Sequence, residues 1–327
     1  MLYKPEEIQN IKLLANNLRT DEEHLQRFFS QEKPITYSKI SIPKRNKKLG
    51  NRIVYKIEEQ FATDILKNLA GLLNELFIPL PCVHGFVSKR NTFSNAKEHL
   101  AKKQILHIDI KDFFETITME QIKHSLIKIG FIEEISDHLS KITTLNGILI
   151  QGLNTSPILA NIVCDDMDKE LISLCNSMQA TYTRYADDIN ISSNINLPIL
   201  ENISQIITKY GFTLNKAKTK YFFRGEKQYV TGLSVFDSFS PRIPRRMKKW
   251  IRLNLFYIGK YGIDSHICRM LKISKDELKT NPEKLLEISK QKAKLRKKIK
   301  GWIDYVNSVE KNLAIKYYNQ YNNLFKN

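Results

Sequence analysis

The sequence predicts an α+β protein, and three observations point to this class. Several short runs are rich in β-forming residues and too brief for helices. Longer segments carry apolar residues at helical spacing, and this helical pattern continues from Pro244 almost to the end of the chain. The 327 residues suggest two domains or one domain with pronounced lobes, and a hydrophobic content of 42% is enough for a sizeable core.

The first part of the chain is predicted to contain helices and one hairpin. Apolar spacing indicates helical structure over residues 1–30, and Pro34 ends this pattern. Runs of β-forming residues over 35–42 and 52–55 predict two strands joined by a basic turn. A long helix with a periodic apolar face is expected over 57–78.

The middle of the chain mixes both kinds of element. Residues 105–110 form an apolar run that is too short for a helix, so we expect a buried strand there. The remaining predicted elements follow in chain order: helices over 119–129, 132–142 and 157–174, strands over 182–185 and 189–192, a helix over 197–210, and strands over 220–223 and 228–234.

Positive charge is concentrated near the C-terminus. The chain has 52 Lys and Arg against 34 Asp and Glu, which gives a formal net charge of +18. Residues 241–300 alone hold 19 Lys or Arg and 5 Asp or Glu. Such a basic helical segment favours a polyanionic partner, with nucleic acid first and an anionic membrane surface second. Solubility alone is the alternative explanation of the charge.

Several protein classes are excluded by composition and pattern. No run of 18 apolar residues occurs, so no transmembrane helix is expected. Of the two candidate partners we expect nucleic acid and no membrane. The first residues show no apolar core of a signal peptide. Four cysteines lack CxxC spacing, which argues against a disulfide framework or a zinc knuckle. These observations favour a cytoplasmic protein with free thiols.

Three aspartates stand out because each lies where a carboxylate is costly. Asp109 falls inside the apolar run 105–110, and Asp187 and Asp188 are adjacent within a bend between two predicted strands. Hard oxygen ligands suit Mg²⁺, and two such ions about 3.5–4 Å apart can activate a hydroxyl and stabilise a leaving group. An Asp-Asp turn with a separate capping Asp is the alternative.

The surrounding motifs resemble those of reverse transcriptases, and specifically of bacterial retrons. The matching segments occur in the order of that family. They are DIKDFF at 109–114, QGLNTSPILAN at 151–161, YADD at 185–188 and GFTLNKAKT at 211–219. Two shorter elements, NAKEH at 95–99 and VTG at 230–232, resemble retron-specific segments on either side of these motifs. The resemblance by motif covers roughly residues 35–235.

The resemblance implies a right-hand polymerase fold, with fingers, a palm built on an antiparallel sheet, and a helical thumb. On this basis we expect N-terminal helices and fingers over 1–105. A palm with interleaved fingers segments is expected over 106–235. The basic helices over 236–327 fit a thumb by length, charge and helical character.

The resemblance also implies an RNA-directed DNA polymerase that uses two Mg²⁺ ions and dNTPs. Asp109, Asp187 and Asp188 are then the metal-binding catalytic residues, and Asp109 and Asp187 bridge the ions most directly. Asp188 is alternatively in part structural. Lys218 is a candidate proton donor to the departing pyrophosphate, or else a phosphate contact or a surface lysine.

Four further residues are expected at the nucleotide. Arg52 is placed to contact the triphosphate, and Phe114 lies where an aromatic ring selects dNTPs over rNTPs. Gln151 and Gly152 are expected to line the pocket, where glycine allows close backbone approach. Alternatively, Arg52 is a solvated side chain and Phe114 is a core phenylalanine, as we expect for Phe113. The alternative for Gln151 and Gly152 is a plain turn.

Other matches lead to weaker expectations. The basic turn residues Lys44, Arg45, Lys47 and Lys48 are best explained as solvated side chains. Asn95 and His99 are expected to support structure or contact RNA, and the VTG segment to hold the primer end. Helix packing is the preferred explanation of Trp302, although aromatic side chains can also stack on unpaired bases.

The expected partners follow from the retron resemblance. They are a cognate structured noncoding RNA that serves as template and primer, its branched DNA product, and a separate effector protein in phage defence. One rival is a group II intron-like or other bacterial reverse transcriptase. The other is a catalytically silent RNA-binding scaffold, against which the three aspartates and Gln151 speak.

Overall fold

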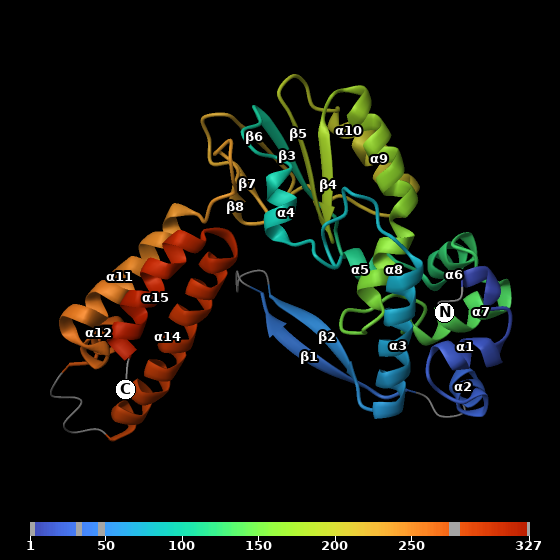
Figure 1. The fold of residues 1–327 in the computed structure, drawn as a ribbon, viewed down its shortest axis with the longest axis horizontal. Coiled ribbons are helices and arrows are strands. Elements are labelled where there is room, and N and C mark those ends of the chain that lie inside the picture. Colours follow the sequence, from blue (N-terminus) through green and yellow to red (C-terminus); the bar gives the residue numbers. More distant parts are fainter. Residues whose placement is uncertain (1–3, 31–34, 45–49, 275–281, 326–327) are drawn as a thin grey trace. The chain divides into compact units, whose positions relative to one another are not determined.

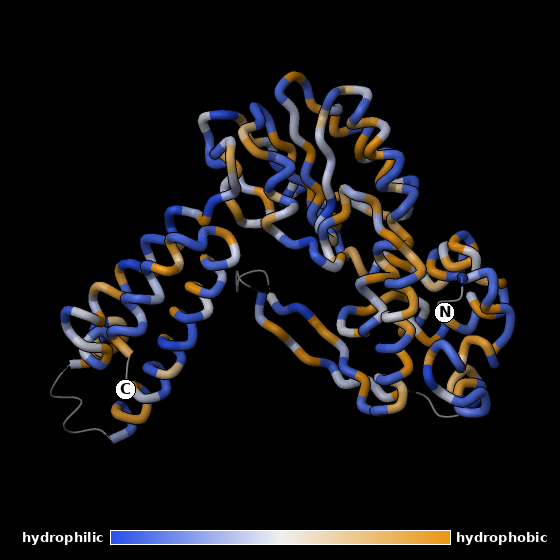
Figure 2. Tube along the Cα trace, in the orientation of Figure 1, coloured by the Kyte–Doolittle hydropathy of each residue, from blue (hydrophilic) through white to orange (hydrophobic). Residues whose placement is uncertain are grey.

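The computed structural model describes residues 4–30, 35–44, 50–274 and 282–325, and these fall into two units (Figure 1). The first unit is Met1–Glu226 and the second is Lys227–Asn327. Along the helices and strands of both units, hydrophobic residues are interspersed with hydrophilic ones, as is typical of elements with one buried face (Figure 2). The division of the chain into 1–105, 106–235 and 236–327 stays a prediction.

The first unit contains a four-stranded antiparallel sheet, drawn at the top of Figure 1. Its spatial order is β4 (Thr181–Tyr185), β5 (Asp188–Ser193), β3 (Gln104–Asp109) and β6 (Lys220–Phe223). All four strands occur where the sequence predicts them. Helices surround this antiparallel sheet, so the predicted α+β class is confirmed.

The two faces of the sheet differ in character. Leu106 and Ile108 of β3 and Ile189 of β5 are fully buried in the hydrophobic core. His107 and Asp109 alternate with them along β3 and therefore point to the opposite, polar face. The apolar face anchors the sheet, which leaves the polar face available for chemistry.

Helices α6 (Met119–Lys128), α7 (Glu133–Ile142) and α10 (Leu200–Lys209) match their predicted positions. The single helix predicted over 157–174 is wrong. The chain instead forms two helices that meet at Cys164, and these are α8 (Ser156–Val163) and α9 (Asp165–Ser177). Cys164 has φ −79° and ψ −5°, and three aspartates in the first turn of α9 favour a new helix N-terminus there.

The helical structure predicted over 1–30 is also interrupted. It consists of a short 3₁₀ helix (Pro5–Glu7), α1 (Ile11–Asn17) and α2 (Glu22–Phe29). The side chain of Asn10 accepts a hydrogen bond from the Leu13 backbone nitrogen at 2.9 Å, and that of Asp21 accepts one from His24 at 2.8 Å. Each cap therefore begins a separate helix.

The predicted hairpin and the helix after it are confirmed. Strands β1 (Tyr37–Pro43) and β2 (Asn51–Ile57) pair antiparallel, and α3 (Gln60–Leu76) follows. The basic turn residues Arg45, Lys47 and Lys48 lie outside the described residues. Two short helices had no counterpart in the prediction, namely α4 (Thr92–Lys97) and α5 (Phe113–Thr116).

A buried ion pair joins the sheet to the helices packed on it. The guanidinium of Arg184 on β4 donates to both carboxylate oxygens of Asp168 on α9, with its closest contact at 2.7 Å. Both side chains are fully buried. Tyr182 donates to the same carboxylate at 2.6 Å, and Arg184 also donates to Asn161 of α8 at 3.1 Å. Every charge in this network is thus matched by a partner.

The second unit begins with a small hairpin and continues as helices. Strands β7 (Tyr229–Val230) and β8 (Leu233–Ser234) replace the one strand predicted over 228–234. They are joined by Thr231 and Gly232, whose φ values of 44° and 81° suit a tight hairpin turn. The helices are α11 (Arg245–Tyr261), α12 (Ile263–Leu271), α14 (Pro282–Val309) and α15 (Lys311–Phe325).

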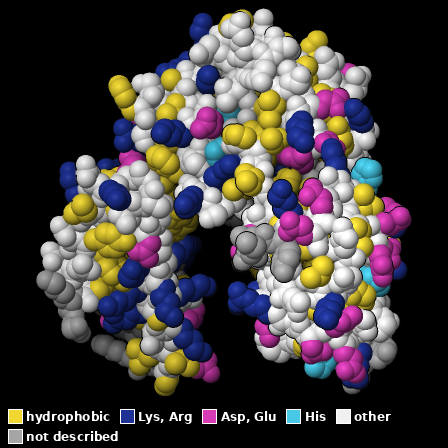
Figure 3. Space-filling view, turned by 45° about the vertical axis from the view of Figure 1, so that its right-hand side comes forward, with side chains coloured by type: hydrophobic (Ala, Val, Ile, Leu, Met, Phe, Trp, Pro, Cys, Tyr) yellow, Lys and Arg dark blue, Asp and Glu magenta, His cyan; other side chains and the backbone are white. Residues whose placement is uncertain are grey.

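The helices of this unit pack around aliphatic and aromatic side chains and carry charge outside. Their shared core contains Ile251, Ile299, Ile303, Val306 and Tyr317. Lys and Arg side chains are spread over the surface of the unit in Figure 3. In the part of the chain that the structure describes, no helix combines the length and the apolar character needed to span a membrane.

We predict that Asp168→Asn lowers the free energy of unfolding by about 3–5 kcal/mol, because it leaves the Arg184 guanidinium buried without a counter-charge. Urea unfolding followed by circular dichroism measures this difference. The matched control is Glu23→Gln, which breaks the exposed Arg27–Glu23 pair on α2 and should cost less than about 1 kcal/mol. Equal losses in the two variants would contradict the importance of the buried pair.

Candidate active site

The bend between β4 and β5 carries two of the predicted aspartates. Tyr185 and Asp188 are paired across the hairpin, so Ala186 and Asp187 form a two-residue loop. Ala186 has a φ of 58°, a conformation that is unfavourable for a residue with a Cβ atom. Such a conformation persists only where the surrounding structure holds it, and here the neighbouring chain does so.

A segment of the first unit lies against this bend and fixes it. Residues 82–85 extend along β4, where the Arg184 backbone nitrogen donates to Cys82 at 2.9 Å and the His84 nitrogen donates to Arg184 at 2.8 Å. Gly85 then reaches the loop itself. A Cβ atom at Gly85 would lie 2.4 Å from the Ala186 nitrogen, which is too close for any other residue.

The third aspartate is brought to the same place by strand register. Asp109 at the end of β3 is the direct partner of Asp188 on β5. The next residue, Ile110, donates its backbone N–H to the Asp187 carbonyl at 2.9 Å. Residues directly opposite on an antiparallel pair point to the same face. The structure therefore gathers the three predicted aspartates, which are distant in sequence, at one edge of the sheet.

In this structure the Asp109 carboxylate is paired with a lysine. The ammonium group of Lys218 lies 2.8 and 3.0 Å from its two oxygens, and the Asn215 side chain donates to it at 3.0 Å. Asp109 is 9% exposed, whereas the Lys218 side chain is about half exposed. The structure thus brings Lys218 to the aspartates, in contact with a carboxylate, and its role as a proton donor stays a prediction.

The other two carboxylates have different surroundings. Burial raises the pKa of Asp187, and the nearby charges of Asp109 and Asp188 raise it further. Asp188 accepts a hydrogen bond from the Asn190 side chain at 2.5 Å, and Nδ1 of His107 lies 3.2 Å from it. Burial alone would lower the pKa of His107, but its contact with Asp188 outweighs this effect and raises it.

The side chains around the three aspartates satisfy the requirements of a divalent cation only in part. Within residues 4–30, 35–44, 50–274 and 282–325, no three Asp, Glu, His or Cys side chains converge closely enough to hold a metal ion. Two features nevertheless fit a hard cation. The carboxylates of Asp109 and Asp187 repel each other, and a cation, Lys218, already lies against Asp109. Asp188 is turned toward His107 and Asn190 instead.

Gln151 and Gly152, which are predicted at the nucleotide, are held by the first hairpin. The Tyr55 backbone nitrogen on β2 donates to the Gln151 carbonyl at 2.8 Å, and the Gln151 side chain donates to Glu115 at 3.2 Å. Gly152 has a φ of 120°, and a Cβ atom there would lie 2.0 Å from the Tyr55 carbonyl oxygen. A glycine is required at this position by the hairpin, a reason that the sequence alone does not show.

The two adjacent phenylalanines occupy different environments. Phe113 is buried in the core, as expected, whereas Phe114 is only partly buried and faces Phe86 at a ring distance of 6.0 Å. Arg52 lies exposed on β2. No hydrogen bond or ion pair of its side chain with the three aspartates is found among the described residues, so the structure does not bring Arg52 to them.

His99 and Asn95 of the NAKEH segment are fully buried. The two ring nitrogens of His99 lie 2.7 Å from the hydroxyls of Ser192 and Thr183, both on the polar face of the sheet. Burial lowers the pKa of His99 to about 3. These positions favour support of the sheet over contact with RNA.

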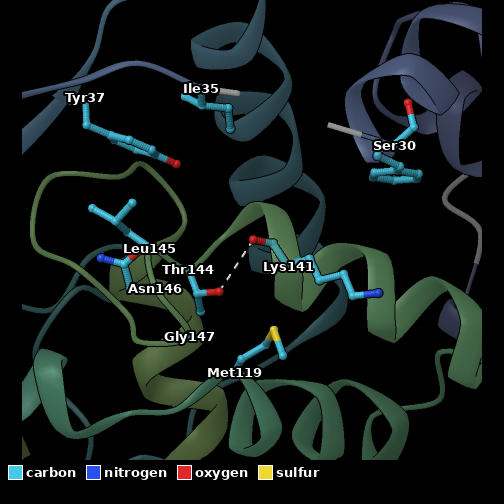
Figure 4. A pocket seen from close by; sticks show the side chains of 10 residues that line it. Ser30, Ile35, Tyr37, Met119, Lys141, Thr144, Leu145, Asn146 and Gly147 are labelled. Atoms are coloured by element: carbon cyan, nitrogen blue, oxygen red, sulfur yellow. Dashed lines mark hydrogen bonds between the residues drawn. The ribbon is translucent and has the colours of Figure 1, made fainter. Parts of the chain in front are cut away.

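A pocket of about 650 Å³ in the first unit lies apart from these residues (Figure 4). Helix α7 contributes Lys141, the loop after it contributes Thr144 and Gly147, and Tyr37 of β1 completes one wall. Ser30 and Ile35 also line it. None of the predicted site residues lines this pocket, so we assign it no function.

Comparison with known families decides the class of the protein. The profile described as "Reverse transcriptase (RNA-dependent DNA polymerase)" matches residues 38–259. The chain belongs to the reverse transcriptase family. The match covers both hairpin strands, the whole sheet and α11 up to residue 259. It confirms the expected polymerase fold.

The similar curated proteins are retron reverse transcriptases, which confirms the predicted resemblance. The retron Mx65 reverse transcriptase of Myxococcus xanthus is 31% identical over 61% of this chain and 51% of its own length. Two Escherichia coli relatives, those of retrons Ec86 and Ec73, are 30% and 34% identical, over 62% and 58% of this chain and 63% and 67% of theirs. The chain spans about half to two thirds of the length of these relatives.

Among solved structures, an apo telomerase from Candida tropicalis, truncated from its C-terminal domain, matches with a TM-score of 0.43. The sequence identity is 15%, over 62% of this chain and 54% of the telomerase chain.

We predict that stability falls as the pH is lowered, in part through His99. Its folded pKa of about 3 lies below the unfolded value, so protons bind only to the unfolded chain between these pH values. The contribution of His99 to the free energy of unfolding should therefore be constant above about pH 6.5 and decline below it, by up to about 1.4 kcal/mol per pH unit.

Urea unfolding between about pH 7 and about pH 4.5 measures this slope for the wild type and for His99→Gln. The variant should be less stable at neutral pH and lose stability less steeply toward acid. His124→Gln, at an exposed position on α6, is the control and should keep the wild-type slope. Identical slopes in all three proteins would contradict a neutral, buried His99.

Proposed function

We propose that this chain is an RNA-directed DNA polymerase that copies a structured noncoding RNA into single-stranded DNA. The observation that carries the proposal is the register of β3 on β5, which sets Asp109 opposite the Asp187–Asp188 bend in a reverse transcriptase. An aspartate cluster at a sheet edge suits phosphoryl transfer, because carboxylates can hold the cations that neutralise phosphate charge.

In this proposal Asp109 and Asp187 hold two Mg²⁺ ions. Bound there, the ions would supply activation of the primer hydroxyl and charge neutralisation at the α-phosphate and the leaving pyrophosphate. The protein's own contribution is to place the carboxylates on a rigid sheet with the hydroxyl and the dNTP in line. Lys218 lies beside Asp109 and is the side chain from which pyrophosphate takes a proton.

The same proposal assigns the dNTP to the residues held by the first hairpin. Gln151 and Gly152 line the base and sugar, where the backbone of Tyr55 fixes them. The partly buried ring of Phe114 excludes a 2′-hydroxyl, and Arg52 contacts the triphosphate. Support for Phe114 comes from its partial burial, because its neighbour Phe113 is fully enclosed in the core.

The basic helices over 236–327 act as the thumb and hold the template and primer. Their Lys and Arg side chains bind phosphates without sequence preference. We assign contact with the primer end to the short turn at Thr231 and Gly232. This assignment completes the division into fingers, palm and thumb, with the palm over 106–235.

The finer proposals concern the biological setting. The names of the relatives support a retron role, in which a dedicated noncoding RNA serves as template and primer and a branched RNA–DNA product results. We place this chemistry in the cytoplasm, with a separate effector protein, in defence against phage.

We predict that the purified protein incorporates dNTPs on a primed RNA template with Mg²⁺. The Asp187→Ala, Asp188→Ala double variant should lose at least about a thousandfold in kcat, because the ions then lack their fixed carboxylates. Primer extension resolved on a gel measures both proteins. Synthesis retained in the double variant would contradict the site, and no synthesis by the wild type on any RNA would favour a silent RNA-binding scaffold.

We predict that Phe114→Ala raises the use of rNTPs relative to dNTPs by about tenfold or more, because the smaller side chain no longer collides with the 2′-hydroxyl. The ratio of kcat/KM for dGTP and GTP on one RNA template measures this discrimination. Phe61→Ala, at a partly exposed phenylalanine on α3, is the matched control and should leave the ratio unchanged. An unchanged ratio in Phe114→Ala would assign that ring to packing alone.

A further inference from the structure

His107 lies on the polar face of the sheet beside the aspartates, and neither the sequence motifs nor the proposed reaction assigns it a role. It precedes Asp109 by two residues on β3, so both side chains point to the same face. Its direct partner on β5 is Asn190, just as the partner of Asp109 is Asp188. The four side chains therefore form two adjacent cross-strand pairs.

The side chains of His107 and Asn190 both contact the carboxylate of Asp188. Nδ1 of His107 lies 3.2 Å from Oδ1 of Asp188 and 3.3 Å from the Asn190 side-chain oxygen. The Asn190 amide donates to the same Asp188 oxygen at 2.5 Å. Because both neighbours of Nδ1 are acceptors, this nitrogen carries the proton. One carboxylate oxygen of Asp188 thus receives a hydrogen bond from Asn190 and lies within ion-pair distance of His107.

The partners of Asp109 are of a different kind. Lys218 holds it with a flexible side chain that is about half exposed, so a cation that arrives from solvent can replace the ammonium at little cost. His107 is only a quarter exposed at its side chain and Asn190 is fully buried. Moving Asp188 away would leave the buried Asn190 amide without this acceptor, which is unfavourable.

We propose that His107 is a positioning residue. It keeps Asp188 beside the metal site but not bound to the ions, so that Asp109 and Asp187 are their direct ligands. This inference rests on the proposed function. Asp188 then acts through its fixed charge and through the shape it gives the bend. Loss of a side chain that supports a metal site without touching the ion typically changes metal affinity or activity by about 10–100-fold.

The test is a double-mutant cycle on His107 and Asp188, with Mn²⁺ as the probe. Free Mn²⁺ is measured by electron paramagnetic resonance for the wild type, His107→Leu, Asp188→Asn and the double variant, and melting temperatures are measured alongside. We expect His107→Leu to weaken Mn²⁺ binding by about tenfold. In the Asp188→Asn background, His107→Leu should weaken Mn²⁺ binding no further, because the carboxylate that His107 positions is already absent.

Two further variants separate positioning from folding. His107→Gln retains a side-chain donor and should recover most of the Mn²⁺ affinity that His107→Leu loses. If His107→Leu does not fold, His107→Gln takes its place in the double-mutant cycle. His124→Leu, at an exposed histidine, is the matched control and should bind Mn²⁺ as the wild type does. The Mg²⁺ concentration for half-maximal dNTP incorporation should shift with Mn²⁺ affinity, while the KM for dNTP stays within about twofold.

The outcomes distinguish this inference from the proposed function. Wild-type Mn²⁺ affinity in His107→Leu, additive losses in the cycle, or no Mn²⁺ binding by the wild type would each overturn the role of His107. If the wild type binds Mn²⁺ and the cycle is non-additive but no dNTP is incorporated, the positioning role stands and the polymerase function fails. If dNTPs are incorporated and the cycle is additive, only the role of His107 fails.

Discussion

The register of β3 on β5 is the constraint on which the rest of the site depends. It sets Asp109 opposite Asp188 and lets the Ile110 backbone bond the Asp187 carbonyl. Side chains alternate along a strand, so a slip of one residue would turn Asp109 into the apolar core. The buried face of the sheet, with Leu106 and Ile108, prevents that slip because it would expose them. The hydrophobic core thus fixes the position of a charge.

Gathering carboxylates is unfavourable, and the structure offsets this cost on both faces of the sheet. On the polar face, Lys218 neutralises Asp109, and donors from the sheet hold Asp188. On the opposite face, the buried Arg184 ties β4 to Asp168 of α9, directly before the bend. Gly85 packs against the bend from the side. A strained loop with like charges is therefore supported by contacts from several distant segments.

The sequence predicts much of this arrangement, and the parts it does not predict share a cause. Hydrophobic periodicity locates the strands and most helices. The ordered motifs predict that Asp109, Asp187 and Asp188 share one site. The break at Cys164, the need for glycine at 85 and the Asp168–Arg184 pair all arise from contacts between residues far apart in the chain. Local spacing carries no record of such contacts. The motif over 211–219 marks Lys218 as a candidate site residue. Only the structure shows that the Lys218 ammonium contacts the Asp109 carboxylate.

The most direct test of the metal-site assignment is anomalous diffraction from crystals of the protein soaked with Mn²⁺. Our account predicts an anomalous peak about 2.0–2.2 Å from oxygens of both Asp109 and Asp187, with the Lys218 ammonium moved away from Asp109. A peak elsewhere, with the Lys218–Asp109 pair intact, would contradict the account.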